Sequence, residues 1–215
     1  MASLTDGAAP YGARPVGTLS ASGSFTGKTR NLPIGGTGIT AYDTAIFNGD
    51  FVKLVANGTI AKDGGTDSLA SVGIFMGCSY TDPTSGQKTF SDQWPADNAA
   101  TDAMAYVLDD PNVLMQMQAD GPMNTTDRGL NVAIVQTAGS TSIGKSKNAI
   151  DAGGTVTPAD TLTLPLRVMD FVSGPHSLAP TGTTVSDQYP DVVVKFNAAS
   201  TFTASPHSYN NPTGL

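Results

Sequence analysis

Glutamate is absent from this sequence of 215 residues, so all 18 acidic residues are aspartate. Glutamate favours helices, whereas aspartate hydrogen-bonds to nearby backbone and favours caps and turns. Lysine and arginine, which also favour helices, number only 11, while glycine numbers 24 and threonine, valine and serine are frequent. The composition therefore predicts an all-β fold and argues against long surface helices.

Cysteine and long apolar runs are also scarce. The single cysteine, Cys78, excludes an internal disulfide and a cysteine-ligated metal site. Its place in the apolar run of residues 72–78 predicts a buried side chain. No apolar stretch approaches the about 18 residues of a membrane span, and no charged start leads into an apolar segment as in a signal peptide. We therefore expect a soluble protein that is made in a cytoplasm and does not bind membranes.

Positive charge is too scarce for a general nucleic-acid binder. The formal net charge is −7, whereas a nucleic-acid-binding surface needs a basic footprint that displaces counterions. The N-terminal region is an exception, because Arg14, Lys28 and Arg30 are opposed only by Asp6. A locally basic segment on an acidic body suits docking to an acidic protein surface.

Turn-forming residues divide the middle of the chain into about ten short strands, which predicts a β-barrel or a β-sandwich of antiparallel strands. Residues 112–118 alternate clearly, with Val113, Met115 and Met117 on one face. We expect a hairpin or tight turn at residues 48–50 (Asn-Gly-Asp) and another turn at residues 109–111 (Asp-Asp-Pro).

Two further local predictions concern the second half of the chain. Residues 161–172 are expected to form a long strand, in which Pro165 marks an edge position or a bulge. Residues 125–128 are expected to form a short helical turn. No internal repeat is found.

The two ends of the chain differ from its middle. Residues 1–20 contain small residues, glycine and proline without an apolar period, and residues 197–215 return to this composition. Such segments bury too little apolar surface to fold alone. We therefore divide the chain into an extended N-terminal arm (1–20), a β-rich body (21–196) and a C-terminal arm (197–215).

One segment matches a nucleotide-binding motif. Residues 139–146 (GSTSIGKS) fit the phosphate-binding loop G-x-x-x-x-G-K-[ST], in which Lys145 would contact phosphates and Ser146 a Mg²⁺ ion. The loop functions only when a helix follows, because the N–H groups of the helix hold the phosphates. Residues 147–152 are too few for a stable helix before the next glycine pair. Nucleotide binding is therefore a remote alternative, and we expect no cofactor.

No other pattern indicates catalysis or metal binding. His176 and His207 lie in loops rich in proline and serine, and no motif links them to Cys78. Four aspartates could ligate calcium but lack the spacing of a calcium-binding loop, and we interpret them as turn residues: Asp63, Asp67, Asp109 and Asp110. We expect the protein not to be an enzyme.

A polar segment between two predicted strands contains three aromatic residues, Tyr80, Phe90 and Trp94. Together they could stack on a sugar, as in a lectin. Packing against the β-rich body or against a neighbouring subunit is the interpretation that we favour.

Short motifs of this chain occur in the same order as in a group of small virion proteins of tailed phages. They are residues 9–16 (APYGARPV), 25–29 (FTGKT), 49–52 (GDFV), 73–80 (GIFMGCSY), 107–112 (VLDDPN), 116–120 (QMQAD), 129–131 (GLN), 166–167 and 210–211. The chain resembles this family over most of its length. It departs from the family at residues 139–146, where the family has a Gly/Ser/Thr loop without a required Gly-Lys pair.

The resemblance implies a capsid decoration (cement) protein on the outside of the phage head. Such proteins bind the major capsid protein as oligomers, often trimers, at local threefold positions of the expanded shell. We expect residues 2–20 to carry much of the contact, so that their deletion would leave a folded body that no longer binds capsids. Arg14 would pair with an acidic patch and Tyr11 would insert as an anchor.

The residues that we predict to contact the capsid or a neighbouring subunit are Tyr11, Arg14, Pro15, Lys28, Arg30 and Trp94. The alternative is a low-copy head-fibre, tail or glycan-binding component of the virion, with residues 80–94 as its contact.

Overall fold

The computed structural model describes residues 7–19, 29–35, 42–154, 156–174, 177, 179–182, 186 and 188–197. Strands in three antiparallel sheets dominate these ranges, and the only helical element within them is the 3-10 turn η1 (Thr125–Asp127). The predicted all-β fold is confirmed, as is the short helical turn. No helix in the described ranges is long and apolar enough to cross a membrane.

The first sheet has six strands in the order β1-β10-β14-β13-β11-β12. Their bounds are β1 (Arg14–Thr18), β10 (Val113–Gln118), β14 (Asp191–Phe196), β13 (Leu166–Phe171), β11 (Asn131–Val135) and β12 (Ala149–Asp151). The N-terminal strand β1 is therefore an edge strand of a sheet that is otherwise built from the second half of the chain.

The second sheet has the order β2-β9-β6-β4-β5, and β7 pairs with the end of the long strand β6. Its strands are β2 (Arg30–Pro33), β9 (Met104–Leu108), β6 (Gly73–Thr81), β4 (Phe51–Leu54), β5 (Ile60–Lys62) and β7 (Lys88–Ser91). The short strands β3 (Ile46–Phe47) and β8 (Gln93–Trp94) pair as a third sheet.

The second sheet is strongly curled. Ile34, which directly follows β2, forms a bridge with Ile60 in β5, at the opposite end of the strand order. One bridge is not a ladder of hydrogen bonds, so the sheet does not close into a barrel. Of the two predicted architectures, the structure resembles a sandwich.

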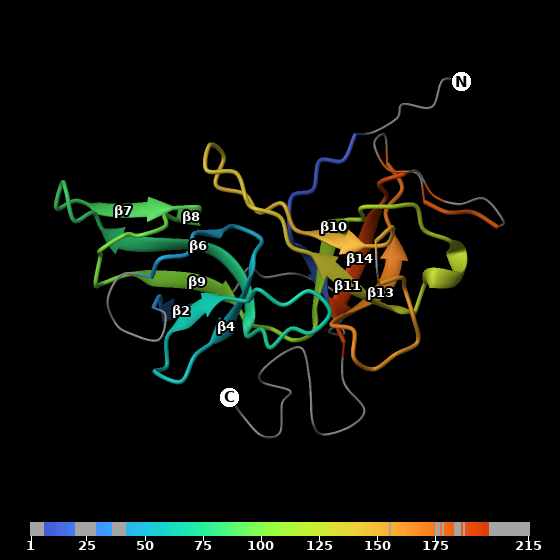
Figure 1. Ribbon diagram of the computed structural model, residues 1–215, viewed down its shortest axis with the longest axis horizontal. Coiled ribbons are helices and arrows are strands. Elements are labelled where there is room, and N and C mark those ends of the chain that lie inside the picture. The colour runs from blue at the N-terminus through green and yellow to red at the C-terminus, as the bar shows by residue number, and fades with distance from the viewer. Residues whose placement is uncertain are drawn as a thin grey trace.

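The two large sheets form two lobes that lie side by side (Figure 1). The chain starts in the first sheet with β1, builds the second and third sheets with β2 to β9, and returns to the first sheet at β10. The return occurs at the predicted turn of residues 109–111, where the N–H of Val113 donates to the carbonyl of Asp110.

The described residues form two apolar cores, and one of them joins the lobes. One core lies inside the second lobe and contains Phe75, Trp94 and Val107. The other fills the first lobe but also includes side chains from strands of the second sheet. Phe51 of β4 packs edge-to-face on Phe196 of β14, with 5.7 Å between the ring centroids. The lobes therefore share a core, and burial of each such aromatic side chain contributes about 1.5–3 kcal/mol.

The alternation predicted for residues 112–118 is confirmed, because Val113, Met115 and Met117 are fully buried. The long strand predicted for residues 161–172 is shorter than expected and begins at Leu166 as β13. Pro165 has no N–H to donate to a ladder, which explains why the strand starts after it.

Much of the segment that the sequence assigns to an N-terminal arm is attached to the body. Residues 14–18 pair with β10 as β1, and Ala13 is only 2% exposed. Deleting residues 2–20 would therefore remove a strand of the first sheet, so the expectation that a folded body remains is not supported. The boundary at residue 20, and residues 198–215 of the predicted C-terminal arm, lie outside the described residues.

Candidate functional site

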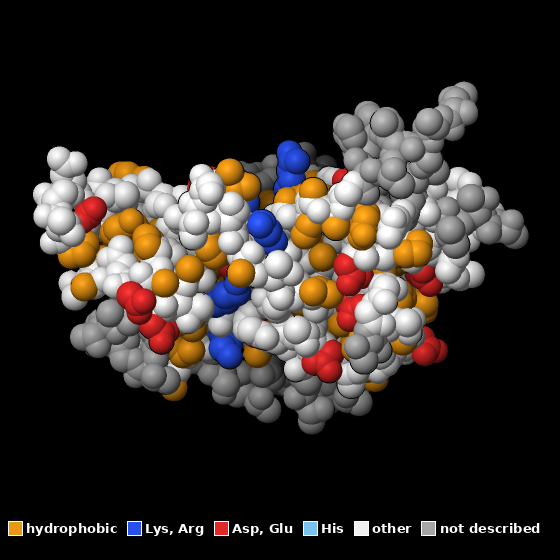
Figure 2. Space-filling view, turned by 45° about the horizontal axis from the view of Figure 1, so that its top comes forward, with side chains coloured by type: hydrophobic (Ala, Val, Ile, Leu, Met, Phe, Trp, Pro, Cys, Tyr) orange, Lys and Arg blue, Asp and Glu red, His pale blue; other side chains and the backbone are white. Residues whose placement is uncertain are grey.

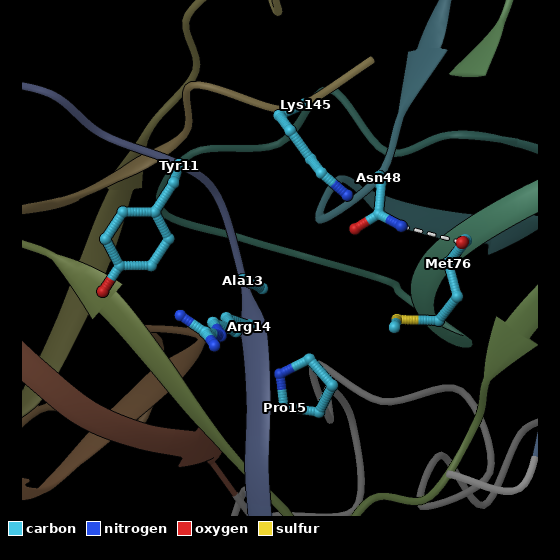
Figure 3. A pocket seen from close by; sticks show the side chains of 7 residues that line it. All are labelled: Tyr11, Ala13, Arg14, Pro15, Asn48, Met76 and Lys145. Carbon is cyan, nitrogen blue, oxygen red and sulfur yellow. Dashed lines mark hydrogen bonds between the residues drawn. The ribbon is translucent and has the colours of Figure 1, made fainter. Parts of the chain in front are cut away.

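A pocket of about 540 Å³ opens where the two lobes meet (Figure 3). The N-terminal segment forms one side of it, and the β3–β4 turn, β6 and the loop before β12 form the rest. The lining residues are Tyr11, Ala13, Arg14, Pro15, Asn48, Met76 and Lys145. The lining thus contains two cationic side chains and no carboxylate, in a chain whose net charge is −7.

Two glycines allow the N-terminal segment to approach the β3–β4 turn. Gly12 and Gly49 have φ values of +76° and +94°, a region that disfavours other residues. A Cβ on Gly12 would lie 2.5 Å from the Cβ of Ser146 and 2.8 Å from the carbonyl oxygen of Gly49. The backbone segments are joined by hydrogen bonds from Ala13 N–H to the Gly49 carbonyl (2.9 Å) and from Gly12 N–H to the Asn148 carbonyl (3.2 Å).

Tyr11 is held at the pocket by the first sheet. Its hydroxyl donates to Oδ1 of Asp191 at 2.8 Å, while Oδ2 of Asp191 accepts from Nε2 of Gln116 at 2.9 Å. Burial, together with the adjacent Asp191 carboxylate, raises the pKa of Tyr11 well above its ordinary value. The phenol therefore stays protonated and serves as a fixed wall of the pocket rather than as a free anchor.

Arg14 is the exposed cation of the pocket. In Figure 3 its guanidinium lies on the same side of the pocket as Tyr11, whereas Asn48 and Met76 lie on the other side. It forms no ion pair with the acidic side chains of the described residues. An exposed guanidinium without a carboxylate partner is available to an anionic group of another molecule.

A fully buried carboxylate, Asp50, fixes the loop that carries Lys145. Oδ1 of Asp50 accepts from the hydroxyl of Ser146 (2.6 Å) and from Nδ2 of Asn148 (3.2 Å). Oδ2 accepts from the Phe47 N–H (3.0 Å) and pairs with Nζ of Lys62 at 3.0 Å. Sequence reasoning did not identify this network, because Asp50 and Ser146 are 96 residues apart.

The phosphate-loop motif has a structural role in this fold. Lys145 pairs with Asp92 at 3.1 Å, and the hydroxyl that would bind Mg²⁺ instead donates to Asp50. The residues that follow the loop form the strand β12, where phosphate binding requires the start of a helix. The geometry at residues 139–151 therefore does not favour nucleotide binding.

The structure brings together three of the six predicted contact residues, Tyr11, Arg14 and Pro15. Arg30 lies elsewhere, on β2, and pairs with Asp109 at 2.9 Å. Lys28 lies outside the described residues.

Trp94 does not belong to a contact surface, and its predicted contact role is corrected here. Its side chain is 1% exposed and its Nε1–H donates to the carbonyl of Tyr42 at 3.1 Å. The indole packs edge-to-face on Tyr80, with 5.3 Å between the centroids. Of the three aromatic residues between 80 and 94, only Phe90 is exposed, at 72%. These residues therefore do not form a shared aromatic platform for a sugar.

Asp63 is one of the aspartates considered as a calcium ligand, and its carboxylate stabilises the loop that contains it. It accepts from the N–H groups of Gly65 and Ala70 and from the hydroxyl of Ser71. Within the described ranges, no group of three His, Cys, Asp or Glu side chains is arranged to hold a metal ion.

Comparisons of the chain with protein-family models, with curated proteins and with solved structures found no match. A function for this protein must therefore be inferred from its own residues and its fold.

Proposed function

We propose that this protein is a capsid decoration protein that binds the outer surface of a tailed-phage head and stabilises the expanded shell. The observation that carries the proposal is the position of residues 9–16, the first motif shared with virion proteins. Within this segment, Arg14 is exposed and lines the pocket between the lobes together with Tyr11 and Pro15. Arg14 has no carboxylate partner among the described residues.

The distribution of charge supports docking to an acidic partner. On the face shown in Figure 2, lysine and arginine side chains gather along the middle of the molecule, whereas aspartates lie to either side. A central positive region on a chain of net charge −7 favours one docking orientation over others. The partner would be the major capsid protein, and the resemblance adds a homotrimer as the bound form.

The proposed activity is binding without chemistry. A protein that binds only the expanded lattice stabilises that lattice by mass action. Linking several weak contacts through an oligomer raises the overall affinity, because each later contact forms at a high effective concentration. Binding of this kind requires only a rigid β-rich body and an exposed contact surface.

The proposal is tested with purified heads from a phage that lacks this gene. The full chain is added, and the bound copies per capsid subunit and the temperature of head disruption are measured. We expect saturation at a fixed ratio and a higher disruption temperature. Arg14→Gln should weaken binding by about tenfold, because loss of one charge-assisted contact costs about 1.5 kcal/mol.

Lys88→Gln is the matched control, since it removes the same charge from an exposed ion pair with Asp102 on the second sheet. It should leave head binding unchanged. Binding that does not saturate, or equal effects of the two substitutions, would contradict the proposal.

A second candidate is a low-copy head-fibre, tail or glycan-binding component. The exposed Phe90 favours it, because this side chain borders a smaller hollow of about 210 Å³ together with Asp92 and Tyr106. An aromatic ring beside a carboxylate is a usable sugar contact. Glycan-array binding that is lost in Phe90→Ser would favour this candidate.

A further inference from the structure

Two positively charged side chains face each other across neighbouring strands of the first sheet. Arg167 on β13 is directly opposite Lys195 on β14 in the strand register. Both are half-buried on the outer face of the sheet, because adjacent residues in their strands, such as Leu166 and Phe196, point into the core. The two strands lie next to each other in the first lobe (Figure 1).

This arrangement is unfavourable for the isolated chain. Like charges directly opposite each other destabilise a strand pair. Burial lowers the pKa of Lys195, and the charge of Arg167 lowers it further. The fold therefore places two cations together where an apolar or oppositely charged pair would be more stable.

The chain does not neutralise the pair with its abundant aspartates. Neither Arg167 nor Lys195 forms an ion pair within the described ranges. Only Asp6 and Asp187, of 18 aspartates, lie outside these ranges. On the same sheet, Asp170 pairs with Arg128, and Asp191 accepts from Tyr11 and Gln116.

The guanidinium of Arg167 is held in a fixed orientation. Its Nε–H donates to Oδ1 of Asn131 at 3.1 Å, and Nδ2 of Asn131 donates to the carbonyl of Thr161 at 2.7 Å. Asn131 is 2% exposed, so its amide is a rigid support. The remaining guanidinium N–H groups have no acceptor in the described part of the chain, which leaves them available for a bidentate contact.

The pair is connected to the pocket by the outer face of the sheet. Val193, two residues before Lys195 on the same face, is opposite Gln116, and Gln116 is opposite Arg14. A polypeptide crossing the sheet from β13 to β1 would therefore meet Arg167 and Lys195 first and Arg14 last. The half-buried Val193 between them offers an apolar contact to such a segment.

We propose that Arg167 and Lys195 bind a carboxylate of an acidic segment of the capsid protein, and that this segment continues toward Arg14. The identity of the partner rests on the proposed function, whereas the carboxylate site rests on the paired cations. A carboxylate between them would remove their repulsion and accept two hydrogen bonds from Arg167. The unfavourable pair is thus explained as a preorganised binding site.

The site is tested first with a labelled, capped hexa-aspartate peptide and the full chain, by fluorescence anisotropy. Lys195→Gln and Arg167→Gln should each weaken binding by about tenfold. Lys53→Gln, which removes a charge from β4 on the second sheet, should change it less than twofold. Lys195→Gln should also raise the melting temperature, an effect opposite to that of losing a purely structural residue. Unchanged peptide binding in both variants would overturn the site, and so would full competition by equimolar inorganic phosphate.

The same variants are then added to purified heads. Loss of both peptide and head binding supports the proposal. Loss of peptide binding with intact head binding would overturn the assignment of the capsid protein as partner, while decoration itself would stand. Failure of the wild-type chain to bind heads would overturn the proposed function and its partner, whereas the peptide titration would still decide the carboxylate site.

Discussion

Replacing Asp50 by alanine tests how the two lobes are joined. The carboxylate is fully buried and contacts Lys62 from the second sheet and Ser146 and Asn148 from the loop that precedes β12. It also accepts a hydrogen bond from the N–H of Phe47, the last residue of β3. Alanine would leave all four groups without this acceptor.

The expected loss of stability follows from the polar groups that remain buried after Asp50 is removed. Removing one partner of a buried ion pair costs about 3–5 kcal/mol. Lys62 retains some access to water, which reduces its part of that cost, but the orphaned Ser146 hydroxyl and Phe47 N–H add about 1–3 kcal/mol each. Because these effects overlap, we expect the free energy of unfolding to fall by about 4 kcal/mol. For a chain of this size, the melting temperature would fall by about 8–16 °C.

Urea denaturation measures this loss, and Asp92→Ala serves as the control. Asp92 pairs with Lys145 at 3.1 Å, but both side chains are exposed, so the control should lose less than about 1 kcal/mol. Hydrogen exchange should accelerate at Ser146 and Asn148 in Asp50→Ala only. Equal destabilisation by the two substitutions would refute the reasoning.

Other predictions concern single residues. Gly12→Ala should lower the free energy of unfolding in urea by about 3 kcal/mol, because Gly12 has a positive φ and the new Cβ would clash with Ser146. Gly58→Ala, at a similar φ but in open space, should lower it by about 1 kcal/mol. Equal losses would argue against the close approach of the N-terminal segment to Ser146. Burial raises the pKa of Cys78 to about 12, so the native thiol should resist iodoacetamide at pH 8.5 and react in urea, and rapid native labelling would contradict this. The Cys78 thiol ionises at about pH 8.5 in the unfolded chain but stays protonated at that pH in the native protein. The contribution of this thiol to the free energy of unfolding should therefore be lost as the pH rises toward 12. The only tryptophan, Trp94, should be shielded from iodide quenching in the native protein, and strong quenching would place it at the surface.

The fold class could be predicted from the sequence because it depends on local properties. The absence of glutamate and the alternation of Val113, Met115 and Met117 both indicate strands, and the structure confirms them. Strand partners depend on contacts between distant segments. The sequence predicted either a hairpin or a tight turn at residues 48–50. The structure has the tight turn, but the flanking strands β3 and β4 do not pair with each other and instead pair with other strands.

The site was predictable only in part for the same reason. Arg14 stands out in a locally basic segment and Tyr11 was predicted only from the resemblance, but no local pattern indicates that residues 14–18 form an edge strand paired with β10. Ser146 was noticed for a nucleotide motif, whereas its hydroxyl stabilises the loop through Asp50. Trp94 was predicted to contact the capsid or a neighbouring subunit, whereas its side chain packs into the core of its own chain.

The measurement that tests the central claim most directly is the number of copies of this chain per major capsid protein in purified virions, by quantitative mass spectrometry. Decoration of the whole lattice predicts a ratio of one to one or a simple fraction of it. A handful of copies per particle, or none, would contradict the account.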